Sequence, residues 1–266
     1  MLFRSERWPH AIVVENRAGA GGAVASEFVA KSVPDGHTLL TISIAYSVIP
    51  SSHRNLGYDP IRDLAPVTVL VNAPNVLVAH PSVPVRTVKG LIALAQSGRG
   101  LDELQYASSG NGSPAHLAGE LLRLLSGANF VHVPYKGTSP AMTDLIGGRV
   151  SFSFGSIVSS VPHVKTGKLR LLAATGSRRA ASLPQTPTIA EEGVAGYAVD
   201  VWYAMLAPAA TPRAVMSMLN HEVTRVLHAA EQRERLADMG LEPVGESLDA
   251  SARYIDAEIA KWAKVA

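Results

Sequence analysis

Short apolar runs alternate with amphipathic segments along almost the whole chain. A short apolar run predicts a strand, and apolar residues repeated every three to four positions predict a helix. Expected strands cover residues 11–15, 38–44, 65–71, 75–79, 104–107, 130–133, 150–154, 169–175 and 199–207. Expected helices cover residues 23–31, 87–96, 113–126, 140–146, 158–165, 215–230, 231–239 and 248–263. This alternation is typical of an α/β protein.

The stretch from residue 104 to residue 154 carries the clearest pattern. A strand leads into the loop Ser108-Ser109-Gly110-Asn111-Gly112-Ser113, and a helix follows that ends at Gly127. Ser113 is a natural N-cap, and Pro114 occupies the first helical position, where its missing N–H removes no hydrogen bond. Strand, helix and strand then repeat, and this order predicts a parallel sheet.

The loop at residues 108–113, called the anion loop below, has the composition of an anion site. Its glycines let the backbone approach a ligand closely. The helix that follows offers free N–H groups and the positive end of its dipole, and three serines add hydroxyl donors. A small carboxylate or phosphate would fit such a site. An ordinary capped turn has the same sequence features, so both interpretations stay open at this point.

Two further segments are candidates for ligand contact. The Gly-rich segment at residues 16–22 resembles a dinucleotide fingerprint, but Val24 stands at the third glycine position and no acidic residue ends the next strand. We therefore interpret it as a Gly-rich turn. Ser43 and Tyr46 follow the expected strand at 38–44, at the strand end where open α/β sheets bind ligands.

Composition narrows the possible functions of these 266 residues. The net charge is +2 without a basic stripe, which argues against nucleic-acid binding, and the lack of cysteine excludes thiolate chemistry. The nine histidines show no metal-binding spacing. We expect His116 and Glu120 to form a surface pair and His132 to be packed. The many hydroxyls and few acids or bases near strand ends favour binding over catalysis.

The order of motifs resembles one known family. VVENRAGAGG, PDGHTLL, NLGYDPIRDLAPVTVL, YASSGNGSPAHLAGE, VHVPYKGTSPAMTDLIGGRV, VPHVKTGKLRLLAATG, LPQTPTIAEEG and EIAKW occur in sequence from about Pro9 to the C-terminus. Together they resemble the Bug/TctC family of extracytoplasmic solute-binding receptors of tripartite tricarboxylate transporters. The resemblance implies a protein that binds a ligand, without catalysis, cofactor or metal.

The resemblance also implies an architecture and a site. It predicts a two-domain, type II-like periplasmic binding protein, or Venus flytrap, with a central sheet in each domain and the ligand cleft between them. The first domain would combine residues 1–101 with 206–266, and the second would cover 102–205, with a linker near Gly100. The ligand-binding residues carried over by motif are Ser43, Tyr46, Ser108, Ser109, Gly112, Ser113, Gly155 and Ser156.

The sequence departs from the family pattern in three places. Family members normally begin with a strand, a loop that carries part of the site and a long helix, and Met1–Arg7 would fall where that helix ends. Pro50-Ser51 replaces an asparagine-proline pair, and Gly155 stands where relatives often have aspartate. MLFRSERWPH lacks the apolar core of a signal peptide, so the expected periplasmic location rests on the resemblance alone.

We therefore expect a monomeric periplasmic receptor that delivers a small carboxylate to the membrane components of its transporter. The alternatives are an α/β enzyme acting on a small anionic substrate and a remnant that no longer binds ligand. The loops expected to face the ligand, at residues 40–47, 108–116, 135–140 and 154–160, contain no Asp or Glu. A ligand ammonium would be buried there unpaired, which predicts an organic acid without an amine.

Overall fold

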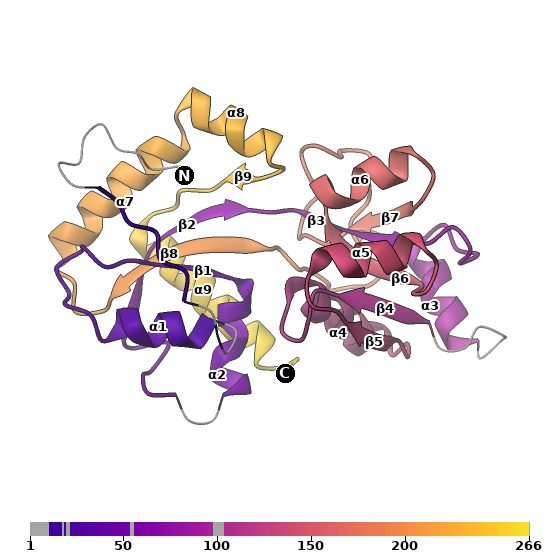
Figure 1. Cartoon of the computed structure of the whole chain (residues 1–266), viewed down its shortest axis with the longest axis horizontal. Coiled ribbons are helices and arrows are strands. Elements are labelled where there is room, and N and C mark those ends of the chain that lie inside the picture. Colours follow the sequence, from indigo (N-terminus) through magenta and orange to yellow (C-terminus); the bar gives the residue numbers. More distant parts are fainter. Residues whose placement is uncertain (1–10, 18, 20–21, 54–55, 98–103, 266) are drawn as a thin grey trace.

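The computed structural model describes residues 11–17, 19, 22–53, 56–97 and 104–265, and these form two sheets that lie side by side (Figure 1). The first sheet has the order β1-β8-β2-β9, and every pairing in it is antiparallel. Its strands are β1 (Leu40–Ser43), β8 (Trp202–Pro208), β2 (Leu64–Asn72) and β9 (Glu242–Pro243).

The second sheet is mixed and has the order β5-β4-β6-β3-β7. β4 runs parallel to β5 and β6, whereas β3 runs antiparallel to β6 and β7. The parallel sheet predicted for residues 104–154 is therefore confirmed, and β3 and β7 extend it on one side. Its strands are β5 (Val131–Pro134), β4 (Gln105–Ser108), β6 (Phe152–Ser156), β3 (Asn75–Ala79) and β7 (Arg170–Ala174).

Helices surround each sheet separately, so that the molecule consists of two lobes (Figure 1). The first lobe contains α1 (Ala23–Ala30), the 3-10 helix η2 (Ile44–Val48), α2 (Ile49–Ser52), α7 (Arg213–Leu227), α8 (Ala230–Asp238) and α9 (Leu248–Trp262). The second lobe contains α3 (Val88–Gln96), α4 (Pro114–Ser126), α5 (Thr138–Ile146) and α6 (Ile157–Lys165).

Local sequence signals fix the ends of several helices. Thr87, Ser113 and Ser247 each accept a hydrogen bond from a backbone N–H of the first turn, as N-caps do. Gly127 ends α4 in the left-handed conformation that glycine adopts without steric penalty. The N-cap predicted at Ser113 and the helix end predicted at Gly127 are confirmed.

The chain passes between the lobes at two neighbouring segments. Ala73 and Pro74 join β2 of the first sheet to β3 of the second. Residues 199–201 lead back into β8, and the Ala73 N–H donates to the Val201 carbonyl over 2.6 Å. The two crossing segments therefore lie side by side.

The sheets divide the chain differently from the expected domains, 1–101 with 206–266 and 102–205. β3 falls inside the expected first domain but pairs with β6 and β7 of the second lobe. The physical reason is Pro74, which has no N–H for a sheet ladder and so interrupts the apolar run between the two strands. The linker expected near Gly100 lies outside the described residues.

The strand expected at residues 11–15 is wrong. These residues belong to no strand, and Ile12, Val13 and Val14 are 50%, 85% and 68% exposed. An apolar run forms a strand only where a neighbour pairs with its backbone, and no described strand does so here. The segment instead contacts α1 through the Arg17 guanidinium, which lies 3.5 Å from the centre of the Phe28 ring.

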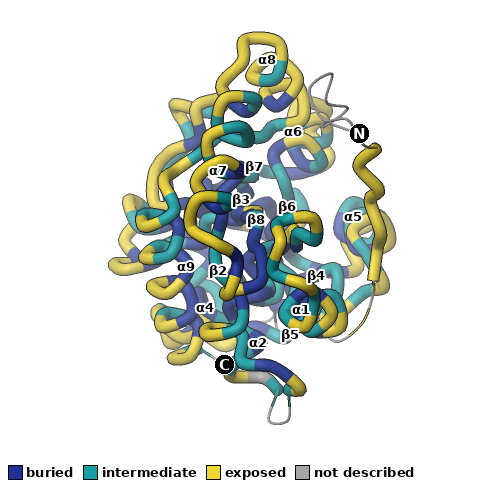
Figure 2. The backbone as a smooth tube through the Cα atoms, turned by 90° about the vertical axis from the view of Figure 1, so that its left-hand side faces the viewer, coloured by how far each residue is buried: buried dark blue, intermediate teal, exposed yellow. Residues whose placement is uncertain are grey.

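The buried residues gather along the strands of both sheets, while α8 is almost entirely exposed (Figure 2). The largest apolar cluster runs through both lobes and includes the fully buried Trp202, Trp262, Tyr106 and Phe152. A shared cluster of this kind holds the crossing segments in place, because separating the lobes there would expose apolar surface.

Candidate ligand-binding site

Three helices begin at the same edge of the second sheet. β4, β5 and β6 are parallel, and each is followed by a helix, so that α4, α5 and α6 all start beyond the carboxyl ends of these strands. Ser113 and Ser156 cap α4 and α6 by accepting from the His116 and Ser159 N–H groups over 3.3 and 3.2 Å. The dipoles of the three helices give this edge of the sheet a positive potential that favours anions.

The anion loop has the compact shape that its glycines permit. Gly110 and Gly112 have φ angles of 128° and 74°, which side chains other than glycine rarely adopt. The Ser113 N–H donates to the Gly110 carbonyl over 3.2 Å, and the Gly110 N–H donates to the Ser108 hydroxyl over 3.1 Å. Ser108 is buried and shapes the loop from inside, whereas Ser109, Gly112 and Ser113 are partly exposed and can be reached by a ligand.

The end of β6 supplies the second group of expected site residues. Ser156 is partly exposed and lies opposite Asn75, the first residue of the neighbouring strand β3. Gly155 is buried, and a Cβ there would lie 2.4 Å from Ser160 Oγ, so aspartate could not take its place without movement of the Ser160 side chain. Ser160 Oγ is itself buried without a hydrogen-bond partner among the described residues.

The first lobe contributes Ser43 to the expected site, but Tyr46 takes a different role. Ser43 ends β1 opposite Tyr203, at the edge where β2 also ends. Tyr46 is 2% exposed and its hydroxyl donates to the Pro60 carbonyl within the first lobe. Burial raises the pKa of this phenol. The Tyr46 hydroxyl is therefore turned away from the expected site and used in packing within the first lobe.

The carboxyl ends of β1 and β2 in the first sheet face the carboxyl ends of β4, β5 and β6 in the second sheet, because β2 continues into β3 across only two residues. Side chains also link the lobes beyond the crossing segments. The Glu242 carboxylate of β9 accepts from Arg178 Nη2 over 3.2 Å and from the Ala181 N–H over 3.1 Å. The expected residues of the anion loop, of β6 and of β1 thus lie on facing edges, while two surface hollows of about 730 and 670 Å³ lie elsewhere, beside α3 and α1.

A cluster of four titratable side chains lies behind the anion loop. Tyr106, His132 and His116 form a stack, and the Tyr106 hydroxyl donates to Glu120 over 2.8 Å. The expected packing of His132 is confirmed. Glu120 pairs with Arg123 over 2.6 Å, rather than with His116 as the surface-pair interpretation implied. This cluster was not predicted from the sequence, because it depends on the parallel register that sets Tyr106 beside His132.

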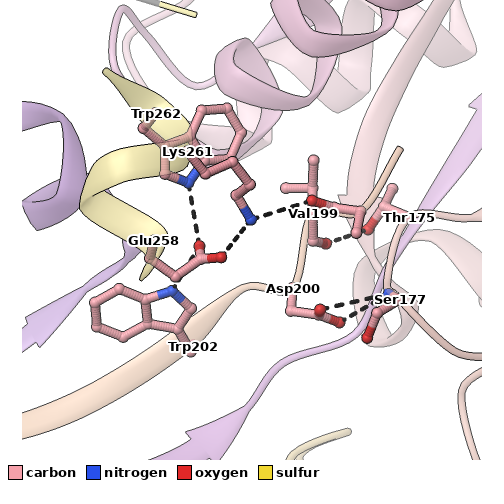
Figure 3. Close-up of polar contacts among 9 residues, drawn as sticks. Thr175, Ser177, Val199, Asp200, Trp202, Glu258, Lys261 and Trp262 are labelled. Carbon is pink, nitrogen blue, oxygen red and sulfur yellow. Dashed lines mark hydrogen bonds and ion pairs between the residues drawn. The ribbon is translucent and has the colours of Figure 1, made fainter. Parts of the chain in front are cut away.

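A second polar cluster lies at the crossing segments (Figure 3). The Glu258 carboxylate of α9 accepts from the indole N–H groups of Trp202 and Trp262 and from Lys261, and Lys261 also donates to the Ala198 carbonyl. On the other side of the same segment, the Ser177 N–H donates to Asp200. This cluster ties α9 to the start of β8 and was not foreseen from the sequence.

Among the described residues, no group of three or more His, Asp or Glu side chains is arranged to hold a metal ion. Among the helices that the structure describes, none has both the length and the apolar character needed to cross a membrane.

Residues 4–266 match the family model described as tripartite tricarboxylate transporter family receptor. The chain is 35% identical to Protein BugT of Bordetella pertussis over 260 residues, which cover 96% of this chain and 78% of BugT. It is also 35% identical to the UPF0065 protein of the tcbD-tcbE intergenic region of Pseudomonas sp. strain P51 over 262 residues, covering 98% of this chain and 77% of that protein.

Solved structures give the same result. Rpa4515 of R. palustris, solved with adipate, matches with a TM-score of 0.83 and 36% identity over 98% of this chain and 87% of that one. MatC of Rhodopseudomonas palustris, solved with bound malate, matches with a TM-score of 0.76 and 31% identity, covering 93% and 85%. The periplasmic binding protein BugD matches with a TM-score of 0.77 and 31% identity, covering 95% and 85%.

These matches confirm the two-domain α/β Venus flytrap fold that the motifs predicted. The matched family is one of binding receptors, and the similar solved proteins are binding proteins rather than enzymes, so the enzyme alternative is wrong. With its motifs, its two-lobed fold and a family match over nearly its whole length, this chain belongs to the TctC family of tripartite tricarboxylate transporter receptors.

Proposed function

We propose that this protein is a periplasmic receptor that binds a small carboxylate between its lobes and delivers it to the membrane components of a tripartite tricarboxylate transporter. The observation that carries the proposal is the convergence of the anion loop and the starts of α4, α5 and α6 on one edge of the second sheet. Free N–H groups and aligned helix dipoles stabilise a carboxylate at such an edge. Membership of a receptor family supports the same function.

The proposed ligand contacts come from both lobes. In the second lobe we assign them to Ser109, Gly112 and Ser113 of the anion loop and to Ser156 at the start of α6, all of which are partly exposed. Ser108 and Gly155 are buried and act by shaping the backbone around these contacts. Ser43 at the end of β1 is the proposed contact from the first lobe.

The ligand class follows from the charge of these loops. Hydroxyl and N–H donors dominate, and residues 40–47, 108–116, 135–140 and 154–160 contain no Asp or Glu to pair with an ammonium group. Two similar proteins have been solved with the dicarboxylates adipate and malate. We therefore propose a di- or tricarboxylate, or a related organic acid without an amine, as the ligand.

We also propose the division and motion of the lobes. The first lobe consists of the described residues within 11–73 and 202–265, and the second of those within 74–201, following the sheet pairings. A ligand that contacts both lobes stabilises the closed arrangement, and rotation about the two crossing segments is the simplest path to it. The receptor acts as a monomer, which light scattering in solution would test.

Calorimetry with a matched pair of cap variants tests the proposed site. Ser113→Ala and Ser247→Ala each remove an N-cap, from α4 in the site and from α9 away from it. Both should lose about 1 kcal/mol of stability. Only Ser113→Ala should weaken binding of adipate or malate, by about tenfold to a hundredfold, because a hydrogen bond to a charged ligand contributes about 1.5–3 kcal/mol.

The choice of ligands tests the chemistry. Succinate, malate, adipate and citrate should compete with one another, and aspartate and glutamate should compete weakly. If none of these acids binds, or if aspartate and glutamate bind best, the proposed ligand class is wrong. If Ser113→Ala and Ser247→Ala bind equally well, the site lies elsewhere.

A further inference from the structure

The anion loop is held at both ends by a stack of aromatic rings. Tyr106 of β4, His132 of β5 and His116 of α4 lie one on another, with ring centres 4.9 Å apart between Tyr106 and His132 and 4.2 Å apart between His132 and His116. The interplanar angles are 24° and 30°, so the rings are close to parallel. Each ring therefore limits the movement of the next.

Each histidine also contacts one end of the loop. The Ser108 hydroxyl, at the start, lies 2.6 Å from His132 Nε2. The Gly112 N–H, near the end, donates to His116 Nδ1 over 3.1 Å. Because Nδ1 accepts this hydrogen bond, His116 is neutral and carries its proton on Nε2. The loop that offers the carboxylate its N–H groups is thus fixed through two imidazoles that also fix each other.

The surroundings of the two rings favour their neutral forms. Burial lowers the pKa of His116, and burial together with His116 lowers the pKa of His132 to about 4. Among the described residues, the other titratable groups at the stack are Tyr106 on β4 and the Glu120–Arg123 pair on α4. Glu120 is the one group that favours protonation of the rings, and its carboxylate is already bonded by Tyr106 and Arg123.

We propose that His116 and His132 are positioning residues for the carboxylate site: as a neutral stacked pair they hold residues 108–113 in their binding shape, and protonation of the pair releases the loop. The inference rests on the proposed function of the anion loop. A protonated His116 has no lone pair on Nδ1 for the Gly112 N–H, and two imidazolium rings in contact repel each other. Acidification should therefore weaken binding in two ways, because it protonates the histidine pair that holds the loop and it protonates the carboxylate ligand.

Paired variants separate hydrogen bonding from packing. His116→Leu and His132→Phe remove the nitrogen that holds the loop, and phenylalanine keeps the stack on Tyr106. His116→Asn and His132→Gln place an amide where the contacting nitrogen stood, so they should restore the hydrogen bond. His221→Leu, on the exposed face of α7, is the control for a histidine remote from the loop.

Titration of adipate into each variant at pH 7.5 gives the first readout. His116→Leu and His132→Phe should bind about fivefold to tenfold more weakly than the original protein, the loss expected when a hydrogen bond that shapes a site is removed. His116→Asn, His132→Gln and His221→Leu should bind close to normally. Amide exchange of Gly110 and Gly112, measured by NMR in the unliganded protein, should be faster in His116→Leu and His132→Phe alone.

The pH profile gives a readout that a purely structural role would not change. Between pH 7.5 and pH 4, where His132 begins to protonate, the affinity of the original protein for adipate should fall more steeply than that of the double variant His116→Asn/His132→Gln. The carboxyl groups of adipate titrate equally against both proteins, so the difference isolates the imidazoles. If the affinity of the original protein instead rises relative to the double variant as the pH is lowered, the inference is wrong, because the protonated rings would then attract the ligand as positive charges.

The outcomes distinguish this inference from the proposed function. If the original protein binds no carboxylate at pH 7.5, the proposed function fails, and amide exchange still decides whether the histidines hold the loop. If the original protein binds adipate and His116→Leu and His132→Phe bind it equally well, the inference is wrong. Circular dichroism of each variant shows whether a loss of binding reflects misfolding, and in that case whichever of His116→Leu and His132→Phe still folds carries the test.

Discussion

Replacing Glu258 by alanine should destabilise the protein strongly, because this carboxylate is the shared acceptor of a buried cluster (Figure 3). Its Oε2 accepts from Trp202 Nε1 and from Trp262 Nε1, each over 3.1 Å. Both tryptophans are 0% exposed and Glu258 is 7% exposed. The substitution leaves two indole N–H groups buried in a space that has lost its only described acceptor.

The magnitude follows from counting the groups left without a partner. Each orphaned N–H costs about 1–3 kcal/mol. Lys261 adds little, since its side chain is 29% exposed and water can replace the lost carboxylate. We therefore expect Glu258→Ala to lower the free energy of unfolding by about 3–5 kcal/mol, the range in which breaking a buried charged pair falls. Glu258→Gln keeps one oxygen for the indoles and should cost about 1–2 kcal/mol.

Urea unfolding followed by tryptophan fluorescence is a direct assay, since Trp202 and Trp262 are two of the three tryptophans in the chain. Asp256→Ala, an exposed position on the same helix, is the matched control and should change stability by less than about 0.5 kcal/mol. If Glu258→Ala is as stable as Asp256→Ala, the indole N–H groups have other partners and the reasoning fails.

Two further predictions concern the stack behind the anion loop. The pKa of His132 is lowered by burial and by His116 from 6.5 to about 4. Between these values the folded state binds fewer protons than the unfolded state. The stability that the neutral His132 ring contributes should therefore be fully present above pH 6.5 and fall as the pH drops toward 4. The shift is about 3 kcal/mol at face value, and solvent screening at this partly exposed ring reduces it to about 1–2 kcal/mol. Melting curves across this range should show the fall in the original protein and a smaller one in His132→Phe; equal slopes would contradict the assignment. Gly119→Ala places a Cβ 2.3 Å from Tyr106 Cε2 and should cost about 1–3 kcal/mol. Gly90→Ala on α3, where the nearest atom is 3.3 Å away, is its control in thermal unfolding, and equal melting temperatures would show that the Tyr106 ring moves freely.

Signals that act within one or two turns of chain could be predicted from the sequence. The Ser113 cap, the Gly127 stop and the anion loop depend on hydrogen bonds and dihedral angles of neighbouring residues. The positions of most strands and helices follow from the same local periodicity. The family motifs are local too. They predicted the fold class and the receptor function, and the family match and the similar solved structures confirm both.

Contacts between residues far apart in the chain were decided only by the tertiary structure. The hydrogen bond from Trp202 to Glu258 spans 56 positions, and the stack of His132 on Tyr106 depends on which strands are neighbours. Tyr46 matched a ligand-loop motif, yet packing places its hydroxyl on Pro60. The apolar run at residues 11–15 satisfies the local pattern of a strand, but a strand exists only where another backbone pairs with it. Burial and pairing are properties of the assembled lobes, and local sequence does not contain them.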